Sequence, residues 1–207
     1  MILRFNPNGL NLKLIDKHLL EMTVKLKTNL ANYTTQPYHP GKNIIVRTIW
    51  YFVNLLFFIN PLNPFGDLKV LLLRIFGAKV GRGIIIKPSV NIKYPWKLTI
   101  GNHVWIGENV WIDNLDEVVI GDNSCISQSV LLLTGNHNYK KTGFDLITGP
   151  IILEDGVWIG AKSMITLNTK CLSHSVLSAG SVLSSNMDSY AIYRGNPAIK
   201  IKDRIIE

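Results

Sequence analysis

The 207-residue sequence predicts an all-β solenoid, in which short parallel strands coil around a prism with three strands to each coil. The first observation behind this prediction is a period of six, which is neither the 3.6 of a helix nor the 2.0 of a plain strand. It fits a short strand followed by a tight turn, with the repeated side chain pointing inward. The repeated residues are Ile100, Ile106, Ile112, Ile120, Ile126 and Leu132, then Leu153, Ile159, Ile165, Cys171, Leu177 and Leu183.

The second observation is a pattern inside each hexad. A glycine or another small residue follows the inward residue, as in Ile159-Gly160, and a small or β-branched residue such as Ser163 comes four positions after it. Glycine permits turn angles that other residues resist. The residue four positions after the inward residue must have a small side chain, because it lies at an inner corner of the prism. Ordinary β-sandwiches give turn signals every 8–12 residues instead, so we favour the solenoid.

The third observation is a break in the hexads between Leu132 and Leu153. Residues 134–149 are polar and contain glycine, which predicts a loop that leaves the prism. Loops on rigid scaffolds carry function more often than the scaffolds do.

The sequence divides into an N-terminal extension, residues 1–79, and a solenoid domain, residues 80–207. Within the extension, residues 44–59 are almost wholly apolar and predict a helix shorter than the roughly 20 residues that a membrane span needs. This helix packs against the solenoid or a neighbouring subunit, which we favour, or lies at a membrane interface. Residues 67–76 predict an amphipathic helix. The hexads fade past residue 183, where Gly195–Ala198 predicts a turn and residues 199–207 a short terminal helix.

Composition limits the functions that this chain can have. Apolar residues make up 47% of the sequence and charged residues 17%, which excludes a disordered chain. The net charge of +8 suits an anionic partner, and because the basic residues are scattered we rank a phosphorylated cofactor and a membrane surface above nucleic acid. Two cysteines without a CxxC motif, and no signal peptide, predict a cytoplasmic protein, with the inner face of the membrane as an alternative. The five histidines lack metal-site spacing, so no metal is expected.

An ordered set of motifs carries a family resemblance over about residues 70–205. The repeats resemble those of the hexapeptide-repeat, or left-handed β-helix, acyltransferases, and the set is similar to the colanic-acid-biosynthesis acetyltransferases and the galactoside and maltose O-acetyltransferases. The resemblance implies a left-handed parallel β-helix, against the usual right-handed crossover rule. The motifs are Leu71–Gly81, Lys87–Val90, Tyr94–Leu98, Ile126–Gln128, Thr134–His137, Val157–Ala161 and Gly195–Ala198.

The resemblance also implies a function and its residues. It implies a homotrimer with active sites in clefts between subunits, acetyl-CoA as the donor and a sugar hydroxyl as the acceptor. His137 matches the catalytic histidine, while Asp113 and Asn114 match acceptor-binding positions. The positions implied for acetyl-CoA are Trp158, Gly160, Ala161, Ala179, Lys200 and Lys202.

The sequence departs from the family pattern in two places. Residues 184–188 lack the usual Thr-Lys-Asp, so one lysine that contacts CoA is missing, and residues 167–172 replace the usual Pro-Gly-Val-Thr-Ile-Gly coil. Both departures bear on the register of CoA binding and neither touches His137.

Direct acetyl transfer to a sugar needs a base that accepts the hydroxyl proton near neutral pH, which histidine can do. His103 competes with His137 for this role, but His137 lies in the one loop that breaks the repeat. The expected function is therefore O-acetylation of a sugar in exopolysaccharide or capsule biosynthesis. An N-acetyltransferase acting on an amino sugar and a non-catalytic relative remain alternatives, and the acceptor stays open among free, nucleotide-linked and lipid-linked sugars.

Overall fold

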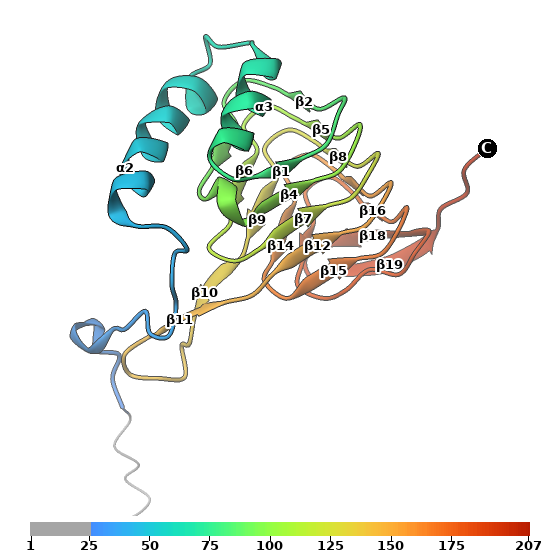
Figure 1. Ribbon diagram of the computed structural model, residues 1–207. Coiled ribbons are helices and arrows are strands. Elements are labelled where there is room, and N and C mark those ends of the chain that lie inside the picture. Colours follow the sequence, from blue (N-terminus) through green and yellow to red (C-terminus); the bar gives the residue numbers. More distant parts are fainter. Residues whose placement is uncertain (1–25) are drawn as a thin grey trace, which may run out of the picture.

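The computed structural model describes residues 26–207 (Figure 1), so the first 25 residues of the predicted extension lie outside the described residues. A stack of short strands forms a prism, and helices cover one side of it at its N-terminal end. The N-terminal elements are η1 (Leu30–Asn32), α2 (Ile44–Val53), its continuation η2 (Asn54–Ile59), and α3 (Gly66–Ile75).

Three sheets form the faces of the prism, and the strands that stack along each face pair in parallel, except for β19 at the end of sheet 2. Sheet 1 contains β1 (Lys79–Val80), β4 (Leu98–Ile100), β7 (Val118–Ile120), β12 (Ile151–Leu153) and β15 (Thr169–Cys171). Sheet 2 contains β2 (Ile85–Ile86), β5 (Trp105–Ile106), β8 (Cys125–Ile126), β13 (Trp158–Ile159), β16 (Val176–Leu177), β18 (Ala191–Gly195) and β19 (Ala198–Asp203). Sheet 3 contains β3 (Asn91–Ile92), β6 (Trp111–Asp113), β9 (Leu131–Leu133), β14 (Met164–Thr166) and β17 (Val182–Leu183). The short helix η3 (Pro95–Lys97) precedes β4.

The predicted ladders are confirmed. Each of the twelve hexad residues is at most 2% exposed, and they pair in register along the sheets, as Ile106 does with Ile126. Val104, Val110 and Ser163, four positions after inward residues, are equally buried. The core is therefore a column of aliphatic side chains that only stacked coils can bury.

The three corners of the prism differ. Sheet 2 leads to sheet 3 through four-residue turns, which we call the short corner: 107–110, 127–130, 160–163 and 178–181. Sheet 3 leads back to sheet 1 through segments of unequal length, which we call the long corner because it includes the longest one: 93–97, 114–117, 134–150 and 167–168. The irregular spacing seen in the sequence thus falls at one edge of the molecule.

The predicted apolar helix over residues 44–59 is confirmed as α2 with η2. One face packs on sheet 3, where the Trp50 indole nitrogen donates to the carbonyl oxygen of Ile92 at 2.9 Å and Asn54 donates to Asn91 at 2.8 Å. Much of the rest of this segment is exposed, and its exposed large side chains are Ile44, Ile45, Ile49, Tyr51, Phe52, Leu55 and Leu56. Within residues 26–207, no helix combines the length and the hydropathy that crossing a membrane would require.

The prediction of a terminal helix over residues 199–207 is wrong. Residues 198–203 form β19, which pairs antiparallel with β18. The turn predicted at Gly195–Ala198 is confirmed and joins the two strands. The physical reason is the open edge of sheet 2: β18 extends that sheet beyond β16, and the backbone groups on its free side find partners in β19.

Candidate active site

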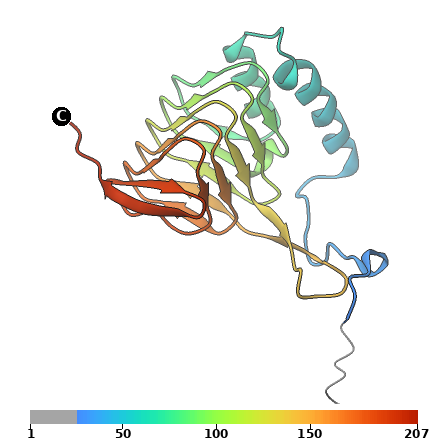
Figure 2. The same cartoon turned by 180° about the vertical axis from the view of Figure 1, so that it is seen from behind.

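The segment predicted to leave the prism is a β-hairpin (Figure 2). Its strands β10 (Gly135–His137) and β11 (Leu146–Thr148) pair antiparallel, with His137 opposite Leu146. Thr134 fastens the base of the hairpin to the coil before it, because its hydroxyl donates to the carbonyl oxygen of Asp113 at 2.9 Å. Gly135 leaves room for Leu115, whose Cδ1 atom would lie 2.5 Å from an added Cβ.

The hairpin holds the imidazole of His137 in one tautomer. Its Nδ1 atom lies 3.0 Å from the carbonyl oxygen of Phe144. A carbonyl oxygen can only accept a hydrogen bond, so Nδ1 carries a proton, and in the neutral imidazole Nε2 is then the nitrogen with the lone pair. A neutral histidine in this tautomer can act as a base through Nε2.

Aromatic rings fix the plane of the imidazole. The Phe144 ring stacks on it at a centroid distance of 4.5 Å and an interplanar angle of 9°, and the Tyr33 ring lies at 5.7 Å. Phe144 has a φ of 55°, an unusual conformation for a bulky residue. A backbone hydrogen bond from Phe144 to Lys141 and an ion pair of Lys141 with Asp145 at 3.1 Å support this turn. The strained backbone conformation thus occurs at the residue whose carbonyl oxygen bonds to His137.

His137 lines a cavity of about 550 Å³. One wall comes from the chain before α2, through Tyr33, Thr35 and Tyr38, and residues 29–34 run beside the hairpin through backbone hydrogen bonds to Thr142 and Leu146. Burial first, and Tyr94 second, raise the pKa of the Tyr38 hydroxyl, which therefore stays protonated and able to donate. The other walls come from the hairpin and the long corner and include Lys93, Tyr94, Asp113, Leu115 and Asn136.

Asp113 is the buried acid of this cavity. It is 8% exposed, and its Oδ1 atom lies 2.9 Å from Lys93 Nζ. The close ion pair compensates the buried charge of the carboxylate. A carboxylate in this position can still accept a hydrogen bond from a ligand.

Asn114, the neighbouring residue with an expected acceptor role, is fully buried. Its side chain accepts from the backbone nitrogen of Tyr94 at 2.9 Å and donates to the carbonyl oxygen of Tyr94 at 2.6 Å. These bonds tie two successive coils together at the long corner, and they turn the amide away from a direct role at the cavity.

The residues expected to line an acetyl-CoA groove lie mostly at or beside the short corner. Trp158 is 48% exposed and donates to the hydroxyl of Ser127 at 3.0 Å. Gly160 is buried against the next coil, since an added Cβ would lie 2.5 Å from the backbone nitrogen of Ala179. Ala161 is half-buried and Ala179 is exposed.

The expected basic residues lie on β19. Lys200 and Lys202 are both exposed. The Lys200 amine lies 2.9 Å from Asp203 and 3.8 Å from Asp188, and the hydrogen bond to Asp203 raises its pKa. Lys200 is therefore charged near neutral pH, although part of its charge is already paired.

One chain does not bring the two halves of the expected site together. His137 and Asp113 lie at the long corner, whereas Gly160 and Ala179 lie at the short corner, with sheet 3 between them. Among residues 26–207, no group of three histidine, cysteine or acidic side chains could hold a metal ion.

Sequence reasoning missed Lys93, Tyr38 and Phe144. For Lys93 a signal existed, because Asn91 pairs with Trp111 and the same register places Lys93 next to Asp113. Tyr38 and Phe144 lie outside the hexad repeats, so the sequence periodicity gave no indication of their positions.

Comparison with known proteins places the chain in a family, although no family model matches it. It is 32% identical over 177 residues to the Escherichia coli protein WcaF, named as a candidate colanic acid biosynthesis acetyltransferase; the match covers 86% of this chain and 97% of WcaF. It is 29% identical over 130 residues to the galactoside O-acetyltransferase of Escherichia coli, covering 61% of this chain and 64% of that enzyme.

Solved structures share the fold. A hexapeptide-repeat acetyltransferase from Vibrio cholerae, complexed with acetyl coenzyme A, superposes with a TM-score of 0.71 at 24% identity, covering 78% of this chain and 88% of that one. A galactoside acetyltransferase in complex with coenzyme A gives 0.69 at 24% identity, covering 77% and 80%. The prism is therefore the left-handed parallel β-helix that these enzymes share. Because the similarity to WcaF extends over most of both proteins, the chain belongs to the colanic-acid-biosynthesis branch of the hexapeptide-repeat acetyltransferases.

Proposed function

We propose that this protein transfers an acetyl group from acetyl-CoA to a hydroxyl of a sugar, with His137 as the general base. The observation that carries the proposal is the hydrogen bond between His137 Nδ1 and the carbonyl oxygen of Phe144, which makes Nε2 the acceptor nitrogen of the neutral imidazole on a residue that lines a large cavity. The names of the relatives support acetyl transfer, and the colanic acid relative supports a role in exopolysaccharide or capsule synthesis.

In the proposed mechanism His137 moves one proton twice. Nε2 accepts the proton of the acceptor hydroxyl as its oxygen attacks the thioester carbonyl of the donor. The carbonyl of Phe144 then stabilises the imidazolium by continuing to accept the Nδ1 proton. When the tetrahedral intermediate collapses, Nε2 returns its proton to the departing thiolate, and the histidine is ready for another cycle.

The donor groove is the second part of the proposal. Trp158, Gly160, Ala161 and Ala179 line it, and Lys200 and Lys202 meet the phosphates of CoA. Because these residues lie across sheet 3 from His137, the complete site requires the long corner of one subunit and the short corner of another. A closed homotrimer provides three such sites.

The acceptor half of the site is formed by the cavity around His137. Asp113 accepts a hydrogen bond from a sugar hydroxyl, since its carboxylate lines the cavity and keeps acceptor capacity beside its ion pair with Lys93. Asn114 supports this position through its bonds to Tyr94. The exposed face of residues 44–59 supports a peripheral contact with the inner face of the membrane.

Replacing His137 tests the chemistry. His137→Ala should lower kcat by about 10²–10⁴-fold, the usual contribution of a positioned base, and leave acetyl-CoA affinity and folding nearly unchanged. Rates of CoA release with a panel of sugars and amino sugars, together with calorimetric binding of acetyl-CoA, provide the measurement.

His103→Ala is the matched control, because His103 also lies on a turn of the prism, outside the cavity. It should keep most of the activity. A His137→Ala protein that retains more than about a tenth of wild-type kcat, a loss under ~1.4 kcal/mol, would refute the mechanism. Turnover confined to amino sugars would indicate N-acetylation instead.

The assembly is tested by its mass. Light scattering should give about three times the 23.3 kDa of one chain. A monomer with full activity would contradict both the trimer and the shared site.

A further inference from the structure

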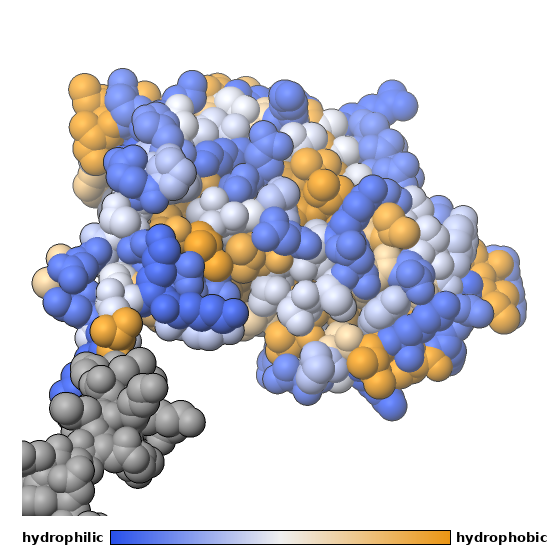
Figure 3. Space-filling view, turned by 90° about the horizontal axis from the view of Figure 1, so that it is seen from below, coloured by the Kyte–Doolittle hydropathy of each residue, from blue (hydrophilic) through white to orange (hydrophobic). Residues whose placement is uncertain are grey.

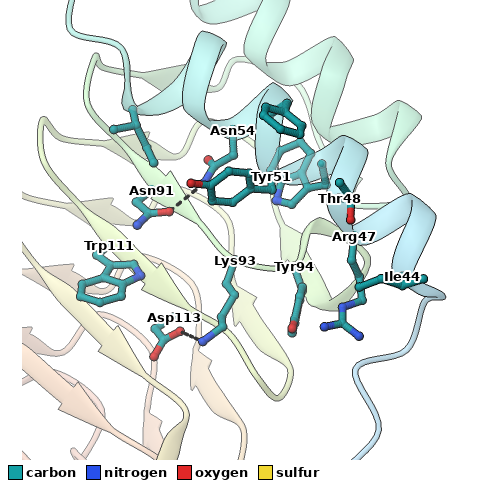
Figure 4. A pocket seen from close by; sticks show the side chains of 13 residues that line it. Ile44, Arg47, Thr48, Tyr51, Asn54, Asn91, Lys93, Tyr94, Trp111 and Asp113 are labelled. Atoms are coloured by element: carbon teal, nitrogen blue, oxygen red, sulfur yellow. Dashed lines mark hydrogen bonds and ion pairs between the residues drawn. The ribbon is translucent and has the colours of Figure 1, made fainter.

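A second cavity lies between α2 and sheet 3 (Figure 4). Its volume is about 520 Å³, within the range of about 300–1,000 Å³ typical of small-molecule sites. Most of its lining is apolar or aromatic, with Trp50, Tyr51 and Phe52 from α2 and Trp111 from β6. The proposed acetyl transfer does not by itself account for an apolar cavity of this size.

This apolar cavity adjoins the one that holds His137. Both are lined by Lys93, Tyr94 and Asp113, which stand at the boundary between them. Figure 4 shows the Lys93–Asp113 pair at the foot of the apolar cavity. A single elongated ligand could therefore reach from the apolar cavity to the base.

The boundary between the cavities carries positive charge. Arg47 and Lys93 line the apolar cavity, where Asp113 is the acidic residue, and Asp113 pairs with Lys93. Within residues 26–207 no carboxylate forms an ion pair with Arg47. One net positive charge remains beside an apolar space, which suits an anionic group attached to a hydrocarbon.

We infer that the acceptor is an amphiphile, in which a sugar is joined through a phosphate-like group to a hydrocarbon chain. The hydrocarbon lies in the apolar cavity, the anionic group meets Arg47 beside Lys93, and the sugar reaches the cavity of His137. The inference rests on the proposed function for the sugar end. The exposed apolar face of α2 fits the same ligand, because a chain longer than the cavity could continue along it toward a membrane.

Binding of two simple alkyl phosphates tests the inference without requiring turnover. Octyl phosphate, kept below its micelle concentration, should bind the wild-type protein at least about tenfold more tightly than ethyl phosphate, because additional methylenes are buried. Calorimetry measures both affinities. Arg47→Gln should weaken both ligands by a similar factor.

A matched pair of variants separates the cavity from surface adsorption. Thr48→Trp places a large side chain in the lining of the cavity and should weaken octyl phosphate binding about tenfold, leaving ethyl phosphate little changed. Leu55→Trp is the control, because Leu55 is exposed on the same helical segment and does not line the cavity. Equal effects of the two variants, or no dependence on chain length, would overturn the inference.

The outcome is separable from that of the proposed function. His137→Ala should lose acetyl transfer and still bind octyl phosphate as the wild-type protein does. Chain-length-dependent binding in a protein that transfers no acetyl group would refute the function alone. Acetyl transfer without such binding would refute the amphiphile alone. If a second copy of the chain fills the cavity instead, octyl phosphate will not bind and Thr48→Trp will change the mass seen by light scattering.

Discussion

The long corner and the short corner belong to the same prism but obey different constraints. At the short corner each turn lies directly on the next, so that Gly160 has no room for a Cβ beside Ala179. At the long corner the segments differ in length: residues 114–117 form a turn as short as those of the short corner, residues 93–97 include the helix η3, and a whole hairpin leaves between Thr134 and Gly149. The difference indicates that the repeat maintains the stack, while the departures from the repeat create the cavity that His137 lines.

The largest difference between the ladder and the long corner is expected in the stability of core variants. Ile126→Ala, inside the ladder, should lower the free energy of unfolding by about 2–5 kcal/mol, because it leaves a cavity in a close-packed column. Leu115→Ala, at the long corner, should cost clearly less, since Leu115 is only half-buried. Urea denaturation of both variants at equal protein concentration measures the difference, and equal losses would contradict the distinction between ladder and corner.

A substitution at Asp113 tests whether the long corner binds the acceptor. Asp113→Asn keeps the shape and removes the charge, so the KM for the acceptor should rise about tenfold, which corresponds to one lost charged hydrogen bond at ~1.4 kcal/mol. The KM for acetyl-CoA should stay within twofold of the wild-type value. Asp116→Asn is the matched control, since Asp116 lies on the same corner outside the cavity. An equal effect of the two substitutions would exclude a specific role for Asp113.

The smallest expected effect lies on the donor side. Reversing the charge of Lys200 and Lys202 together should raise the KM for acetyl-CoA several-fold with little change for the acceptor, because both side chains are exposed and water screens their charge. High salt should shrink the effect. Steady-state kinetics at two ionic strengths provide the check, and a change confined to the acceptor KM would show that the basic residues were assigned to the wrong substrate.

Sequence alone predicted the parts of the fold that follow from periodicity. The ladders from Ile100 to Leu183, the departure at residues 134–149 and the apolar helix at residues 44–59 are all present. The terminal helix was wrong because a short segment without a repeat is decided by its neighbours: β18 offers β19 an open edge, and no local signal in residues 199–207 records that edge.

The candidate site was only half accessible from the sequence. His137 could be found because it interrupts the repeat, but the group that orients it is a backbone carbonyl, which any residue at position 144 would supply. The wall formed by Tyr33 and Tyr38 depends on how the chain before α2 lies beside the hairpin, a long-range contact that periodicity does not describe. The burial of Asp113 could not be expected from its turn-like sequence context.

The hairpin closes at its base, where the backbone nitrogen of Gly149 donates to the carbonyl oxygen of Thr134 at 3.0 Å. The chain therefore leaves and re-enters the prism at nearly one point. The stacking of the neighbouring coils does not depend on how many residues the hairpin contains. Doubling the length of such a flexible excursion costs only about 0.6 kcal/mol in closure entropy. Evolution or protein engineering can thus change the length of the hairpin tip between His137 and Phe144, while Gly160 and Ala179 at the short corner keep their packing.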